Sequence, residues 1–106
     1  ISPHEIAKNR LLHLDTNGFS KDFYSELSHI TRQFVEKSCY IRTLEMTTEE
    51  ISQNKNILDM NDDIFSEWVS LLKKADLIKF AKKSTPITEM EDDKRVAFKI
   101  INKALN

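Results

Sequence analysis

The sequence predicts an all-α fold in which four to five helices form one compact domain. A single glycine and two prolines in 106 residues leave few of the turn residues that a strand-rich fold needs. Apolar residues recur at helical spacing, and cap residues precede several of these stretches. The chain is 40% hydrophobic and 31% charged, a composition typical of globular proteins. We therefore predict a single helical domain over residues 1–106.

The first predicted helix runs from about Pro3 to Leu14. Proline suits the first turn of a helix, and Ser2 can cap it. The apolar residues expected on one face of this helix are Ile6, Ala7, Leu11 and Leu14. Asn17 and Gly18 then tolerate the left-handed backbone that ends helices, so they predict a stop.

The second predicted helix begins at its cap, Ser20, and fades near Ser38. Its core-facing stripe has spacings of four, three and four, and consists of Phe23, Leu27, Ile30 and Phe34. The following residues, 39–41, favour an extended step. Thr47 and Glu50 then predict a capping box at the start of a short third helix that ends near Asn54.

The fourth predicted helix is capped by the cluster at residues 61–63 and is mostly buried. Its apolar residues cover a wide arc and are Ile64, Phe65, Trp68, Val69, Leu71, Leu72 and Ala75. Residues 76–81 could continue this helix or form a strand, because a short apolar run cannot be assigned by its period alone. Thr85 and Pro86 predict the start of the last helix, in which acids precede lysines as the helix dipole prefers.

Patterns typical of catalytic, nucleotide or metal sites do not occur in the sequence. One glycine cannot build a phosphate cradle, and the three histidines lack the i, i+4 spacing of a helical metal pair. Cys39 and His29 are ten residues apart and so fall on different helix faces, which favours a buried thiol over a nucleophile. Acid pairs at helix starts are explained by capping and the helix dipole. We predict no enzymatic activity, no cofactor and no metal.

Charge is segregated along the chain, although 16 basic and 17 acidic side chains nearly cancel. The segment from Thr43 to Glu67 has a single lysine, Lys55, and seven acids: Glu45, Glu49, Glu50, Asp59, Asp62, Asp63 and Glu67. Residues 73–83 instead carry one acid and five lysines, Lys73, Lys74, Lys79, Lys82 and Lys83. Such clusters are either solvated faces or surfaces that dock a protein partner or an anionic membrane. These five lysines are the candidate partner-binding residues.

The stretch FYSELSHITRQFVEKSCYIRTLEMTTEEI, followed by ADLIKFAK, resembles a bacterial family of short membrane-anchored proteins of unassigned activity. Members are encoded near MoxR-type AAA ATPases and von Willebrand A-domain proteins, in clusters that include the Bat aerotolerance group. The opening PHEIAKNRLLHL is also similar to the segment after that family's transmembrane helix. The step Ser38-Cys39-Tyr40 departs from the family's usual one, which contains Phe, Gly and a charge. Residues expected to build the fold are Phe23, Tyr24, Leu27, Ile30, Phe34, Thr47, Glu50, Trp68, Asp76 and Phe80.

The resemblance implies a domain on the cytoplasmic face of the bacterial inner membrane, and a single cysteine fits a reducing compartment. Residues 1–15 would lead from an anchor upstream of this chain. The implied function is a non-enzymatic adaptor whose protein partner is the ATPase or the von Willebrand A-domain protein.

An alternative function follows from the order of the expected elements. A helix, a short strand, two helices and a strand at Leu77 to Phe80 would form a winged-helix-like unit with a reduced wing. In that case the five lysines would bind nucleic acid, although the overall charge and the lack of arginine among them argue against it.

Overall fold

A computed structural model describes residues 1–105 and confirms the all-α prediction. The described residues form five α-helices: α1 (Pro3–Leu12), α2 (Ser20–Cys39), α3 (Thr48–Ser52), α4 (Asp62–Ala81) and α5 (Ile87–Lys103). Two short 3₁₀ helices, η1 (Thr43–Glu45) and η2 (Lys55–Ile57), flank α3. Over this part of the chain the only β-type pairing is an isolated bridge between Met60 and Leu105.

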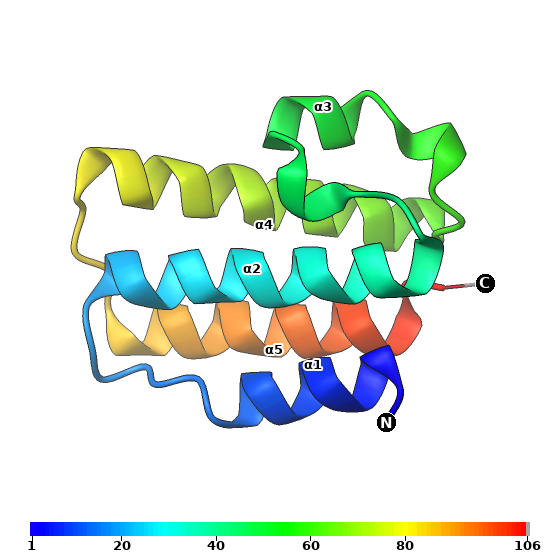
Figure 1. Ribbon diagram of the computed structural model, residues 1–106. Helices are drawn as coiled ribbons and strands as arrows, with labels where there is room; N and C mark the ends of the chain where they lie inside the picture. The colour runs from blue at the N-terminus through cyan, green and yellow to red at the C-terminus, as the bar shows by residue number, and fades with distance from the viewer. Residues whose placement is uncertain (106) are drawn as a thin grey trace.

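The long helices α1, α2, α4 and α5 alternate in direction and form an up-and-down bundle (Figure 1). Helix α2 packs against α1, α4 and α5. Helix α5 also packs against α1 and α4. As a result, α1 and α4 lie on opposite sides of the central α2–α5 pair. Both loops between adjacent long helices, α1–α2 and α4–α5, lie together at one end of the bundle.

The predicted apolar stripes of α2 and α4 form the core, whereas only Ala7 and Leu11 of the first predicted stripe are buried and Ile6 is exposed. All four stripe residues of α2 are buried, and so are the seven apolar residues expected on α4. Trp68 is fully buried, and its indole N–H donates to Thr31 Oγ1 at 3.0 Å. This bond satisfies the one polar atom of the largest core side chain, at the interface between α2 and α4.

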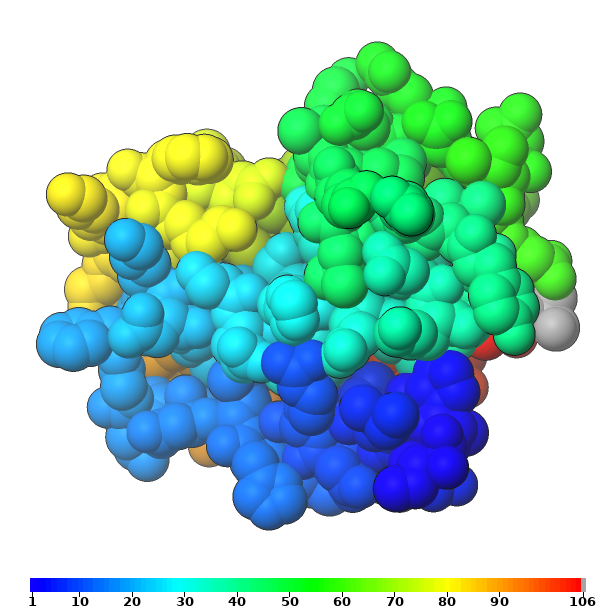
Figure 2. Space-filling model, viewed as in Figure 1, coloured from blue at the N-terminus to red at the C-terminus, as the bar shows by residue number. Residues whose placement is uncertain are grey.

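The connection from α2 to α4 covers one side of the bundle instead of forming a short turn. Figure 2 shows it as a green projection, separate from the yellow end of α4. The expected extended step at residues 39–41 is wrong, because Cys39 is still helical and Tyr40 ends the helix with φ of 59°. The capping box is confirmed, since Thr47 accepts from the backbone of Glu50 and Glu50 accepts from that of Thr47. Ile51 is fully buried and anchors α3 on α4.

Arg32 of α2 ties this connection to the bundle. Its guanidinium donates to the carbonyls of Thr43 and Met46 and to Thr48 Oγ1. Thr48 Oγ1 in turn donates to Asp76 Oδ2 at 2.6 Å, which links α3 to α4. Burial lowers the pKa of Arg32, and the charge of Asp76 partly offsets that effect. One side chain thus holds η1, the start of α3 and, through a threonine, α4.

Helix boundaries differ from the prediction at the end of α1 and at the start of α2. Ser2 caps α1 as expected, but the helix ends at Leu12 and not at Leu14. Ser20 is the first residue of α2, not its cap; the N-cap position is held by Phe19, which makes no side-chain capping bond. Residues 77–80 are helical, because α4 continues without a break to Ala81 and buries Ile78 in its last turns. Of the two alternatives that the sequence left open for residues 76–81, helix or strand, the structure shows the helix.

Candidate functional site

The five candidate lysines do not form one surface. Lys74 Nζ lies 2.7 Å from Asp93 and 2.8 Å from Glu89, both on α5. Lys79 lies 3.5 Å from Asp76 within α4. The other three, Lys73, Lys82 and Lys83, are exposed. Two of the predicted docking charges therefore serve internal ion pairs, and three are available at the surface.

Lys74 belongs to a small polar cluster that joins α2, α4 and α5. The hydroxyl of the buried Tyr24 donates to Asp93 Oδ2, the atom that also pairs with Lys74. Burial, the bond to Asp93 and nearby carboxylate charge raise the pKa of Tyr24. Burial alone would lower the pKa of Lys74, but hydrogen bonds to Asp93 and Glu89 outweigh it and raise the pKa. Both groups keep their protons at neutral pH, so the cluster stabilises helix packing.

Exposed apolar side chains occur near the loop end of the bundle, where two of the exposed lysines, Lys82 and Lys83, also lie. Phe80 is 85% exposed, Phe19 is 80% exposed and Leu77 is 70% exposed. Phe80 was expected to build the fold, and it does not; the nine other residues of that set are buried or take part in the hydrogen bonds and caps described above. We define the basic–aromatic end as Phe19, Lys21, Leu77, Phe80, Lys82, Lys83 and Ile87. Exposed apolar side chains with lysines beside them are typical of interaction sites.

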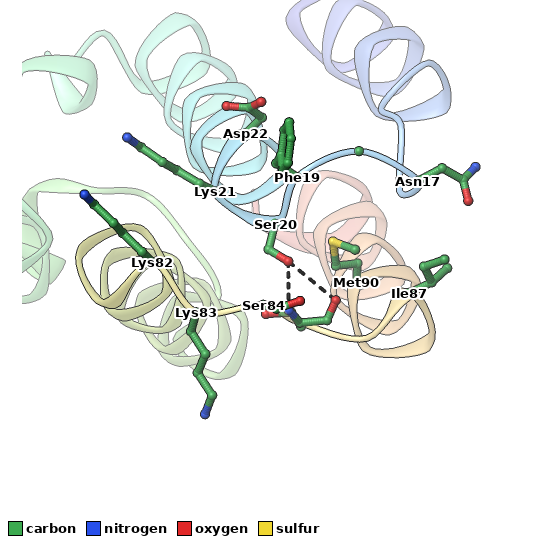
Figure 3. Close-up of a pocket in the computed structure, with 12 residues that line it drawn as sticks. Asn17, Phe19, Ser20, Lys21, Asp22, Lys82, Lys83, Ser84, Ile87 and Met90 are labelled. Atoms are coloured by element: carbon green, nitrogen blue, oxygen red, sulfur yellow. Dashed lines mark hydrogen bonds between the residues drawn. The ribbon is translucent and has the colours of Figure 1, made fainter.

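Two grooves flank the α4–α5 connection, residues 82–86, at this end. The first has a volume of about 580 Å³ and lies between the start of α2, with Phe19 and Lys21, and the connection, with Lys82 and Lys83 (Figure 3). The buried Met90 and the half-exposed Ile87 of α5 complete its lining. The second groove, of about 530 Å³, lies across the same connection and includes Leu77. Both grooves share residues 83–85.

Ser20 and Thr85 fix the wall of the first groove. Ser20 Oγ accepts from the backbone N–H of Thr85 at 2.8 Å and donates to its carbonyl at 3.4 Å (Figure 3). This pairing explains why Ser20 does not cap α2. Helices α2 and α5 both begin without a side-chain cap, at Phe19 and Pro86. Their first turns line or adjoin the groove, so the partial positive charge of two helix starts adds to that of the lysines.

Sequence reasoning missed Phe19, Lys21 and Ile87 as members of this surface, because no local pattern sets them apart. They meet Lys82 and Lys83 only because the antiparallel helices bring the two loops together. One local feature could have indicated Phe19. This large apolar residue follows the predicted stop at Asn17-Gly18 and so lies on no predicted helix face.

The acidic segment lies at the other end of α4, which spans about 30 Å at 1.5 Å per residue. Its acids are mostly paired locally: Glu45 with Arg42, Asp62 with Lys55, and Glu50 in its capping box. Cys39 is half-buried near this end, and desolvation raises the pKa of its thiol. These contacts account for the acids as structural groups.

None of the helices in residues 1–105 is long and apolar enough to cross a bilayer. The same residues contain no group of three or more His, Cys, Asp or Glu side chains placed to hold a metal ion. No family model, curated protein or solved structure matches the chain. The basic–aromatic end is therefore the candidate site on the strength of its own geometry.

Proposed function

We propose that this chain is a non-enzymatic interaction domain that docks an acidic partner protein on its basic–aromatic end. The observation that carries the proposal is the set of four exposed apolar side chains beside three exposed lysines at one end of the bundle. Apolar contact supplies most of the binding free energy at such surfaces. The lysines would speed encounter with an acidic partner and fix its orientation.

The resemblance suggests the setting for this interaction. We propose that the domain works at the cytoplasmic face of a bacterial inner membrane, with a MoxR-type ATPase or a von Willebrand A-domain protein as its partner. Ile1 lies at the end of the bundle opposite the loops (Figure 1). An anchor upstream of Ile1 would thus leave the basic–aromatic end facing away from the bilayer, where a cytoplasmic protein could reach it.

The nucleic-acid alternative gains no support from the arrangement of the helices. Residues 1–105 contain no strand from which a wing could be built. Two of the five lysines that would contact phosphates are paired with carboxylates instead.

Recovery of a partner from the native host tests the proposal. The full-length protein is used as bait in its original sequence, as Phe80→Ser and as Ile57→Ser. Ile57 is a matched control, because it is half-exposed and lies on η2, away from the loop end. We expect the original sequence and Ile57→Ser to retain an ATPase or a von Willebrand A-domain protein, and Phe80→Ser to lose it. Equal recovery with all three baits, or recovery of neither class of protein, would count against the proposal.

Charge reversal provides a second test on the purified partner. Lys82→Glu with Lys83→Glu should weaken binding strongly and leave the melting temperature nearly unchanged, because exposed charges contribute only about 0–1 kcal/mol each to stability. Asp62→Lys with Asp63→Lys should leave binding unchanged and lower the melting temperature, since these acids favour the start of α4 by about 0.3–1 kcal/mol each. Unchanged binding in the lysine variant would show that the basic segment is a solvated face.

A further inference from the structure

We propose that the partner contributes an extended acidic segment that lies in the first groove, between the start of α2 and the α4–α5 connection. Its carboxylates would meet the starts of α2 and α5 together with Lys21, Lys82 and Lys83. A bulky apolar side chain of the segment would pack against Phe19 and Ile87. This inference rests on the proposed function and specifies the chemistry of the segment that docks.

The groove favours negative charge for two separate reasons. Three lysine side chains line it, against one carboxylate, Asp22. In addition, the helices that start beside it have no side-chain caps, whereas α1, α3 and α4 are capped by Ser2, Thr47 and Asn61. Unpaired N–H groups in a first helical turn bind carboxylates well, and the helix dipole adds to the attraction.

The shape and lining of the groove favour a protein segment over a free anion or a bilayer. Its volume of about 580 Å³ exceeds the space that a phosphate or a single carboxylate would fill. The apolar parts, Phe19, Ile87 and Met90, would remain uncovered by a small anion. A flat lipid surface could touch only the rims of a groove between two loops. An extended segment can place both an acid and an apolar side chain inside it.

The groove is held in shape before any partner binds. Ser20 and Thr85 exchange two hydrogen bonds across its wall. Lys82 ends α4 in the left-handed conformation with φ of 51°, and the N–H groups of both Lys82 and Lys83 bond to Ile78. A site that is already ordered loses little conformational entropy on binding, which favours useful affinity from a short segment.

Selection from random peptides tests the inference without knowledge of the partner. Random twelve-residue peptides are displayed on phage and selected on the folded chain, and the recovered peptides are synthesised for fluorescence anisotropy. We expect sequences rich in Asp and Glu with at least one bulky apolar residue. Affinity should fall at least tenfold for Lys82→Gln with Lys83→Gln, and rise severalfold for Asp22→Asn, which removes the opposing charge. Lys8→Gln with Lys103→Gln makes the same charge change away from the groove and should have little effect.

Amide chemical shifts locate the peptide. In a ¹⁵N-labelled sample the largest changes should fall on the N–H groups at the two uncapped helix starts, Ser20, Lys21, Ile87 and Thr88. Recovered peptides without acidic residues, unchanged affinity in the double lysine variant, shifts centred elsewhere, or no recovered peptide would each overturn the inference.

A vesicle control separates lipid from peptide. Vesicles of phosphatidylglycerol and phosphatidylcholine that bind the chain through Lys82 and Lys83, when no peptide does, would also overturn the inference in favour of a lipid surface. The proposed function has its own test, because Phe80 lies outside the first groove. If the peptide test fails and Phe80→Ser still loses the partner, the docking end stands and only the segment assigned to the groove is wrong.

Discussion

Replacement of Arg32 by methionine tests whether one polar side chain holds the α2–α4 connection in place. Methionine keeps the apolar stem of the side chain and removes every donor. The carbonyls of Thr43 and Met46 and the hydroxyl of Ser28 then lose their bonds to the guanidinium. Thr48 loses one partner but still donates to Asp76.

The expected cost follows from these lost bonds. A hydrogen bond from a charged donor contributes about 1.5–3 kcal/mol, and two carbonyls are left without this donor. The lowered pKa of Arg32 shows that burial disfavours its charge. Removal of that charge therefore offsets part of the free energy lost with the hydrogen bonds. We expect a net loss of about 2–4 kcal/mol. For a domain of 106 residues, this corresponds to a fall of about 8–16 °C in melting temperature.

Thermal melts and hydrogen exchange measure this effect, with Arg42→Met as the matched control. Arg42 is exposed and pairs with Glu45 three residues later, so its replacement should cost less than about 0.5 kcal/mol. Exchange should rise most in α3 and η1 of the Arg32 variant, because these elements lose their link to α2. Equal melting temperatures for the two variants would refute the reasoning.

Three further variants test other parts of the structure. Trp68→Phe removes the donor to Thr31 and leaves unfilled core volume, so chemical denaturation should show a loss of about 1–3 kcal/mol; a smaller change than that of an exposed substitution would contradict the assigned bond. Hydrogen bonds from the backbone and side chain of Thr47 lower the pKa of Glu50 in the folded protein. The carboxylate therefore stabilises the fold above its ordinary pKa of about 4.3. This contribution is lost as pH falls through the lower pKa of the folded protein. Glu50→Ala should accordingly show a shallower fall in melting temperature on acidification, and parallel curves would show that the capping box does not titrate. Lys82→Gln with Lys83→Gln should melt within about 2 °C of the original sequence, since both side chains are exposed; a larger drop would mean that they support the fold.

Local patterns were sufficient to predict the parts of the fold that depend on a single helix. The stripe from Phe23 to Phe34 has a strict helical period, and the box formed by Thr47 and Glu50 is complete within four residues. Both are confirmed. The burial of Trp68 followed in the same way, from an arc of apolar residues too wide for a surface helix.

Contacts between residues distant in sequence could not be predicted from such local patterns. Serine is a common N-cap residue, but the hydroxyl of Ser20 bonds to the backbone of Thr85, 65 positions later. Lys74 was assigned to a docking surface, and acids of α5 pair with it instead. Phe80 has the size and apolarity of a core residue, and only its direction from α4 leaves it exposed. The candidate surface itself depends on two loops that meet in space, which no local pattern reveals.

The first and last helices, α1 and α5, bring residues near the two ends of the chain together, far from the grooves. His4 near the start bonds to Asn102 near the end at 2.6 Å, and Leu105 pairs with Met60. A reporter protein, a solid support or a short joining peptide attached at either terminus would therefore leave the loop end unobstructed. The same proximity makes the chain suitable for circular permutation, with the termini joined and a new opening made in the exposed loop near Asn17. A permutant cut there would keep all five helices whole and release one wall of the first groove, so loss of peptide binding with retained helicity would measure how far that wall must be fixed.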